Sequence, residues 1–148
     1  MIFQCALAGD GAGRRVSSAG AIDGDGYQDL IVGAWGGDDG FSRAGEAYVV
    51  FGTASGFGVN VGGRQVIDLT DLAPAEGFII QGDEYNDGAG WSVSSAGDVN
   101  GDGYDDLIVG ASAGDNGGTI AGQAYVVFGT ASGFGVDVGG RQVIDLTT

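Results

Sequence analysis

Short apolar runs alternate along this chain with stretches rich in glycine and aspartate. Runs such as Leu30–Val32 and Ala47–Phe51 consist largely of valine, isoleucine, tyrosine and phenylalanine, and each ends at a glycine. Segments of this length and composition are typical of strands in antiparallel sheets. No stretch shows the periodicity of an amphipathic helix. The pattern therefore predicts an all-β fold.

The whole pattern occurs twice, with an offset of 77 residues. Residues 121–147 repeat residues 44–70 with differences only at Glu46/Gln123 and Asn60/Asp137. We therefore expect one segment over residues 1–148, with a first repeat unit at 1–77 and a second at 78–148. The expected strands, paired by this offset, are Met1–Gln4 and Phe78–Gln81, Val16–Ala19 and Val93–Ala96, Leu30–Val32 and Leu107–Val109, Ala47–Phe51 and Ala124–Phe128, and Val66–Leu69 and Val143–Leu146.

A repeat of this size with about four strands per unit is the signature of a β-propeller blade. A blade cannot cover both of its own faces, so it stacks against neighbouring blades. The composition agrees, because 33 glycines against one proline suit many short strands joined by tight turns. We expect two four-stranded antiparallel blades.

Residues 98–106 place oxygen-bearing side chains at alternate positions, with glycines between them, directly before an apolar strand. Ca²⁺ takes about six to eight oxygen ligands, and a tight loop supplies them from positions 1, 3, 5, 7 and 9, with a backbone carbonyl at position 7. This pattern predicts a calcium site. The candidate ligands are Asp98, Asn100, Asp102, the carbonyl of Tyr104, and Asp106.

An EF-hand loop begins in the same way but needs a glutamate at position 12 and a helix on each side. Position 12 here is Val109, inside a β-branched run, so the EF-hand interpretation is excluded. The remaining alternative is a turn without metal, since Asp, Asn and Gly favour turns on their own. Against it, three carboxylates in one tight loop repel each other unless a cation neutralises them.

The equivalent loop of the first unit has Ala21 at position 1, where the second has Asp98. It still holds three carboxylates, because an aspartate replaces the asparagine at position 3. We expect this loop to bind calcium with a water in place of the missing ligand, and more weakly than the second. Its candidate ligands are Asp23, Asp25, the carbonyl of Tyr27, and Asp29.

The sequence Gly90-Trp91-Ser92-Val93-Ser94, followed by the 97–106 loop and Leu107-Ile108-Val109-Gly110-Ala111, resembles the FG-GAP repeat of integrin α-chain β-propellers and their bacterial relatives. The likeness covers nearly the whole chain twice. It implies four-stranded blades in which the calcium loop joins the first strand to the second and Phe78–Gln81 is outermost. It also implies that the ions brace one face of the ring while other loops bind a protein or carbohydrate. An adhesive role at the cell surface or outside the cell would follow.

Twenty acidic residues against five arginines and no lysine give a net charge of −15, which repels nucleic acid and anionic membranes. There is no histidine, so imidazole catalysis and His-ligated zinc or copper are excluded. Cys5 is the single cysteine and is expected to be a small buried apolar residue. No run is long enough for a membrane span, and the first residues lack the features of a signal peptide.

Two blades cannot close a ring, because propellers take about four to eight. The first strand, Met1–Gln4, corresponds to an outer strand, and the second unit stops before its own outer strand. We therefore expect a homo-oligomeric ring of three or four chains, in which Met1–Gln4 pairs beside Ala124–Phe128 of another copy. The alternatives are an excised piece of a larger propeller and an engineered or recently duplicated self-assembling chain.

A non-enzymatic scaffold for binding or adhesion is the function that the sequence favours. The competing hypothesis is a hydrolase with paired carboxylates in a central channel, which needs two acids in contrasting environments. Most clustered acids are already assigned to calcium. The acids left over lie in glycine-rich turns: Asp38, Asp39, Asp83, Glu84, Asp87 and Asp115.

Three further positions carry expectations. Arg14 stands where the second unit has Trp91, which suggests that this flank of the blade meets a carboxylate or solvent. Trp35, whose counterpart is Ser112, is expected to pack between blades. Arg141 is expected in solvent.

Overall fold

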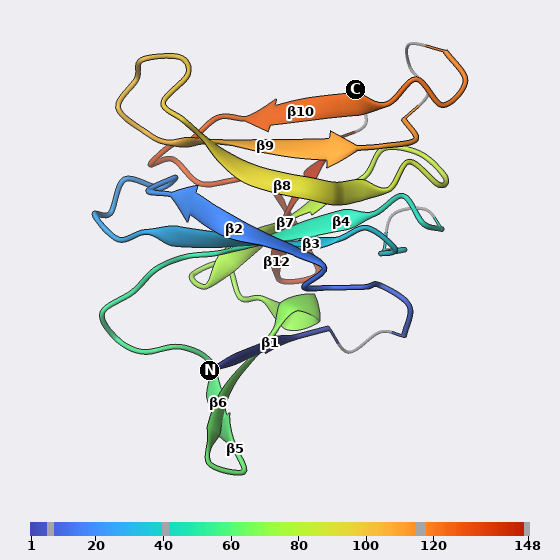
Figure 1. Cartoon of the computed structure of the whole chain (residues 1–148). Helices are drawn as coiled ribbons and strands as arrows, with labels where there is room; N and C mark the ends of the chain where they lie inside the picture. The colour runs from blue at the N-terminus through green and yellow to red at the C-terminus, as the bar shows by residue number, and fades with distance from the viewer. Residues whose placement is uncertain (6–7, 40–41, 115–117, 147–148) are drawn as a thin grey trace.

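The computed structural model describes residues 1–5, 8–39, 42–114 and 118–146, and its regular secondary structure is almost entirely β (Figure 1). Asp115, one of the acids left unassigned by the sequence, lies outside these residues. The elements are β1 (Ile2–Gln4), β2 (Arg15–Gly20), β3 (Asp29–Ala34), β4 (Glu46–Val50), β5 (Val59–Val61), β6 (Arg64–Asp68), η1 (Leu69–Asp71), β7 (Gly77–Gln81), β8 (Ala89–Gly97), β9 (Asp106–Ala111), β10 (Gln123–Val127), β11 (Val136–Val138) and β12 (Arg141–Asp145).

The first blade has the strand order that the sequence predicts. β2, β3, β4 and β7 follow one another with antiparallel pairing, and residues 21–28 join β2 to β3. Two strands of the second unit extend this sheet, because β12 pairs with β7 in parallel and β11 pairs with β12. β7 is therefore the fourth strand of its blade but does not end the sheet.

The second blade contains three strands in the order β8, β9, β10. Its equivalent of β7 is β1, which lies at the far end of the structure beside β6 (Figure 1). β1 pairs with β6 in parallel, as β7 pairs with β12. The prediction that the second blade lacks its own outer strand is confirmed for the described part of the chain.

Two short strands were missing from the sequence prediction. β5 and β11 form hairpins with β6 and β12, and their side chains are exposed throughout. They carry no buried face, so no apolar run marks them. A 3₁₀ turn, η1, follows β6, and the Asp68 side chain caps it by accepting a hydrogen bond from the Thr70 N–H.

The two blades stack face to face, and the larger core fills the space between them (Figure 1). Ile31, Val49 and Phe78 of the first blade are buried there against Leu107 and Val109 of the second. All five side chains are at most 1% exposed. Burying a side chain of this kind contributes about 1.5–3 kcal/mol, so this interface is a main source of the stability of the fold.

A second core lies on the opposite face of the first blade. Val32, Tyr48 and Ile79 are buried in it, and Phe3 of β1 packs against them. Cys5 also packs here, and burial raises the pKa of its thiol to about 11. The expectation of a packed rather than reactive cysteine is consistent with this position. Among the described residues no helix is long and apolar enough to cross a membrane.

Glu46 is a buried acid that hydrogen-bonds to Tyr48 of this second core, and 2% of its surface is exposed. Its carboxylate accepts hydrogen bonds from the Tyr48 hydroxyl and the Asp39 N–H. Burial raises the pKa of Glu46 above its usual value of 4.5. The second repeat has Gln123 at this position, where the amide oxygen accepts the equivalent bond from Tyr125.

Replacing Glu46 by glutamine should therefore make stability less dependent on pH. Folded Glu46 holds its proton to higher pH than the unfolded chain does, so it lowers stability as pH rises above 4.5. Each unit of raised pKa costs about 1.4 kcal/mol at neutral pH. Melting curves at pH 4 and pH 7 should show Glu46→Gln close to the parent at pH 4 and more stable at pH 7.

The reciprocal change, Gln123→Glu, serves as the matched control. It should introduce a pH dependence of the same sign but smaller size, because Gln123 is only half-buried. Equal pH profiles for the parent and Glu46→Gln would contradict the assignment of a buried, proton-retaining carboxyl.

Candidate metal centre

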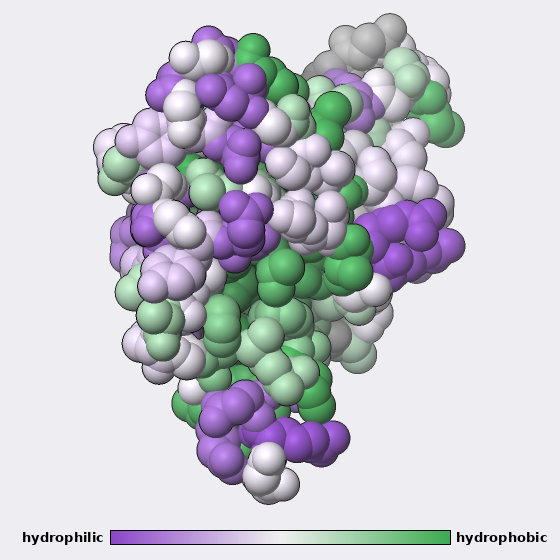
Figure 2. Space-filling view, turned by 60° about the vertical axis from the view of Figure 1, so that its left-hand side comes forward, coloured by the Kyte–Doolittle hydropathy of each residue, from purple (hydrophilic) through white to green (hydrophobic). Residues whose placement is uncertain are grey.

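The two candidate calcium loops lie one above the other at the same edge of the molecule. One joins β2 to β3, the other joins β8 to β9, and both project on the left in Figure 1. Figure 2 brings this edge forward and shows hydrophilic surface over the upper part of the molecule and an apolar band beneath it. The arrangement follows from the repeat, since equivalent turns of stacked blades emerge on the same side.

Asp98 organises the second loop. One of its carboxylate oxygens accepts hydrogen bonds from the N–H groups of Gly101, at 2.6 Å, and Asp102, at 3.0 Å. The other accepts from the Gly103 N–H at 2.9 Å. These hydrogen bonds lower the pKa of Asp98, and the bond from Gly103 has the largest effect. The side chain is therefore a carboxylate at neutral pH, exposed at the mouth of the loop.

Asn100 and Asp102 continue the loop with exposed side chains. The Asn100 side-chain N–H donates to Asp102 Oδ2 at 2.9 Å, and Asp102 Oδ1 accepts from the Tyr104 N–H at 2.9 Å. Asp98, Asn100 and Asp102 therefore meet at one surface. The two glycines within the loop, Gly101 and Gly103, have positive φ angles of 77° and 93°, which L-residues with side chains rarely adopt.

Asp106, the last predicted ligand of the second loop, is fully buried. Its two oxygens accept from the Val99 N–H at 2.8 Å and the Gly129 N–H at 2.9 Å. It ties the start of the loop to the end of β10. Each carboxylate oxygen keeps a second lone pair, so this role does not remove Asp106 from the donor set.

The first loop repeats this design. Buried Asp29 accepts from the Ile22 N–H at 2.9 Å and the Gly52 N–H at 2.8 Å, and burial raises its pKa. Asp23 accepts from the Asp25 N–H at 3.0 Å, as Asn100 does from Asp102 in the second loop. Asp25 in turn accepts from the Tyr27 N–H at 2.8 Å. No carboxylate of this loop takes the place of Asp98.

A side chain from the second loop instead occupies the start of the first. Asp105 Oδ2 accepts from the Ala21 N–H at 2.8 Å. The Tyr104 ring lies over Gly24, where an added Cβ would stand 2.4 Å from the ring. The two loops are thus in direct contact, which the sequence alone did not indicate, because the interacting residues are 80 or more positions apart.

The donor types fit a hard cation, since all candidate ligands are oxygen atoms. In the described residues, however, no three acidic, histidine or cysteine side chains stand close enough together to hold a metal as they are placed. The exposed carboxylates are turned toward backbone N–H groups. A bound cation would have to draw Asp98 and Asp102 toward itself.

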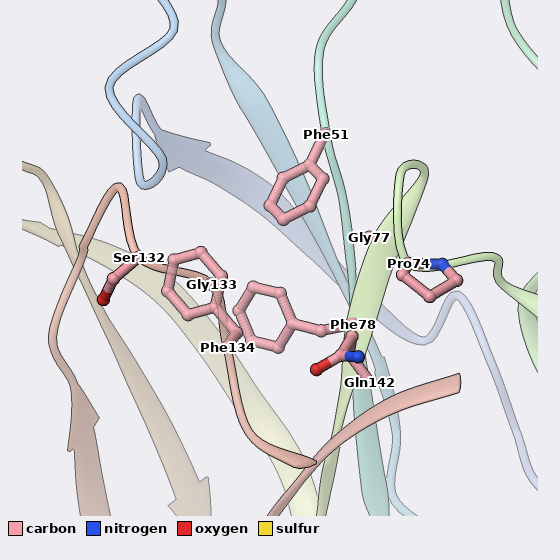
Figure 3. Close-up of a pocket in the computed structure, with 8 residues that line it drawn as sticks. All are labelled: Phe51, Pro74, Gly77, Phe78, Ser132, Gly133, Phe134 and Gln142. Carbon is pink, nitrogen blue, oxygen red and sulfur yellow. The ribbon is translucent and has the colours of Figure 1, made fainter. Parts of the chain in front are cut away.

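A pocket of about 320 Å³ lies between the repeats and carries no acid or base in its lining. Phe51, Phe78 and Phe134 point toward one another across it (Figure 3). The rings of Phe78 and Phe134 stack with centroids 4.2 Å apart. A lining of aromatic, small and neutral residues contributes packing rather than acid–base chemistry.

Trp35 packs between the repeats as expected, with its ring 5.4 Å from that of Trp91. Arg14 is exposed to solvent, as expected, and its guanidinium also lies over the Trp91 ring, 4.9 Å from the ring centroid. The expectation that Arg141 lies in solvent was wrong. It forms a 2.8 Å ion pair with Asp39 of the first repeat.

The carboxylates of Asp29 and Asp106, which tie the loops to their blades, should stabilise the fold with or without calcium. Asp106→Ala would leave two backbone N–H groups without partners, a loss of about 2–5 kcal/mol and a fall in Tm on the order of 10 °C. Asp29→Ala should behave alike. Thermal unfolding in a chelator measures both. Asp25→Ala, at an exposed position, is the control and should cost less than about 1 kcal/mol; equal losses for all three would contradict the assignment.

Comparison with known families gives one match: residues 89–127 match the FG-GAP repeat. The match runs from β8 to β10 and includes the whole second loop. A search of curated proteins gave no significant match.

Proposed function

We propose that this chain, whose second blade is an FG-GAP repeat, is a non-enzymatic scaffold stabilised by calcium. FG-GAP repeats form propeller-type scaffolds, and the stacked blades agree with that architecture. The observation that carries the calcium proposal is the pair of adjoining loops, each with alternating oxygen donors, at one edge of the blades. Asp98, Asn100 and Asp102 have exposed side chains there, and hydrogen bonds within the loop hold them together.

Electrostatics supports a cation at this edge. The chain has a net charge of −15, and the loops bring carboxylates from both repeats into one region. Hydrogen bonds from backbone N–H groups hold Asp98 in its ionised form. Ionised carboxylates that converge in this way repel one another, and a divalent cation removes that repulsion.

The second loop would hold the ion through Asp98, Asn100, Asp102, the Tyr104 carbonyl and Asp106. The first would use Asp23, Asp25, the Tyr27 carbonyl and Asp29, with a water where Asp98 has no counterpart. Calcium affinity depends on the number and charge of ligands and on the rigidity of the site. The first loop should therefore bind more weakly.

A hydrolase is less well supported than a scaffold. The chain has no histidine, and the pocket between the repeats is lined by aromatic, small and neutral side chains. Asp83 and Asp87, two acids left unassigned by the sequence, are buried rather than presented in a cleft. Binding and assembly therefore fit the chain better than hydrolysis does.

Calcium titration with paired variants tests the proposal. Asp98→Ala should weaken the stronger site about tenfold or more, because it removes a charged ligand. Ala21→Asn should strengthen the weaker site, because it restores an oxygen donor without adding charge beside Asp105. Isothermal titration calorimetry should find two unequal sites in the parent chain and two similar sites in Asp98→Ala. An unchanged titration for Asp98→Ala would exclude position 1 as a ligand.

Calcium should also raise the melting temperature, because an ion that binds only the folded chain stabilises it by mass action. The increase should disappear as the pH falls toward about 4, where carboxylates take up protons and lose the ion. Differential scanning calorimetry in calcium, in magnesium and in chelator at pH 7 and pH 4 measures this. The same Tm in calcium and chelator at pH 7 would refute calcium stabilisation.

A further inference from the structure

The two outward faces of the chain are counterparts of the interface inside it: the face on the second blade is uncovered, and the face on the first blade is only partly covered, by β1, β6 and η1. Within the chain, one face of the first blade packs against the opposite face of the second. Because the blades are repeats, each blade has both kinds of face. The second blade therefore has an outward face equivalent to the inward face of the first blade. The first blade has an outward face equivalent to the inward face of the second blade. We call these the tail face, on the second blade, and the head face, on the first.

The tail face exposes the apolar side chains that the internal interface buries. Val126 is 44% exposed, whereas its counterpart Val49 is 0% exposed. Ile108 is 38% exposed against 0% for Ile31. Val99, at the start of the second loop, is 56% exposed, whereas the equivalent residue of the first loop, Ile22, is fully buried. Sequence equivalence predicts equal burial, so each difference marks surface that a neighbouring blade would cover.

The head face shows the complementary difference. Val16 is 65% exposed, although its counterpart Val93 packs against the core between the blades. Tyr27 is 46% exposed, whereas Tyr104 lies over Gly24 and is half-buried. The glycine that a second Tyr27 would cover is Gly101, and a Cβ added there would meet no atom within 4 Å.

β1 packs on the first blade in the same way as its counterpart β7 packs on the second blade. Phe3 of β1 packs on one face of the first blade, as Ile80 of β7 packs on the second. β7 also pairs antiparallel with β4 along its other edge. The corresponding edge of β1 pairs with no described strand, and neither does the outer edge of β10, the counterpart of β4.

The outward faces also carry the counterparts of the aromatic residues in the interblade pocket, but these counterparts are divided between the two faces. Phe51 lies 5.9 Å from Phe134, ring centre to ring centre. Their counterparts are Phe128, which is 54% exposed, and Phe57. Phe57 and Met1 line a second hollow at the first repeat that has no counterpart of the Phe51 wall.

We propose that the head face binds the tail face of a second copy of this chain. β10 of one copy pairs with β1 of the next, and Phe128 closes the hollow at Phe57. The contact is heterologous, so successive copies form a ring if the rotation closes and a filament if it does not. The assembly goes beyond the calcium proposal, because the apolar faces are exposed whichever ion the loops hold.

Two contacts would differ from those inside the chain. The internal Trp35–Trp91 pair becomes Ser112 facing Arg14, by the same equivalence. The bond from the Ala21 N–H to Asp105 becomes one from the Asp98 N–H to Gln28, whose amide oxygen is also an acceptor. The contact between copies is therefore more polar than the internal one, and the internal one is the tighter.

Single charges on each face test the proposal. Val126→Asp on the tail face and Val16→Asp on the head face should each weaken self-association at least about tenfold, because a charge buried at an apolar interface is costly. Both positions are exposed in the single chain, so neither change should prevent folding. Val61→Asp is the matched control, since Val61 and its counterpart Val138 are both exposed, at 54% and 46%, and lie outside both faces. Analytical ultracentrifugation of the full chain in calcium gives the mass of each species.

A mixture of the two variants separates the head-to-tail contact from other modes. Val16→Asp keeps an intact tail face and Val126→Asp keeps an intact head face, so an equal mixture should form a complex of one chain of each, although each alone is monomeric. A misfolded variant could not be rescued in this way. A monomeric parent chain, equal loss with Val61→Asp, or a mixture that stays monomeric would each overturn the proposal. Calcium binding is measured separately on the same samples, so a failure of that proposal is recognised independently.

Discussion

The stacking of one apolar sheet face on another is the interaction on which the rest of this structure depends. A blade is apolar on both faces, so it is stable only where neighbours cover it. The first blade obtains one cover from the second blade and part of another from β1, β6 and η1. The second blade has cover on one face only. Its exposed valine, isoleucine and phenylalanine side chains follow directly from that difference.

The loops at the edge are positioned by the same stacking. Asp29 and Asp106 are buried because each ties the start of its loop to the strand end across the blade, at Gly52 or Gly129. Stacking then sets the second loop on the first, with Tyr104 over Gly24. The proposed calcium sites therefore depend on the blades for their geometry, while an ion would reduce the repulsion that this geometry creates.

Most of the fold followed from the sequence because strands with a buried face leave a strong pattern. β3, β4, β9 and β10 were predicted to within two residues at each end on that basis. β5 and β11 were missed because both of their faces are exposed. The candidate ligands were recognised by spacing alone. The burial of Asp29 and Asp106 and the contact between the loops could not be predicted, because both depend on partners far away in the sequence.

Several differences between the repeats fall where the repeats touch. Trp35 and Trp91 contact each other, and Arg14, the counterpart of Trp91, lies over both rings. Asp105, whose counterpart is Gln28, binds the backbone of Ala21, whose counterpart is Asp98. Residues 44–70 and 121–147 are nearly identical, although Phe51 and Phe134 from these segments also meet between the repeats. If the faces were the same in both repeats, a blade could stack on either neighbour without preference. The positions equivalent to Trp35 and Trp91 hold Ser112 and Arg14, so the proposed contact between copies would lack the Trp–Trp pair and would differ from the internal contact.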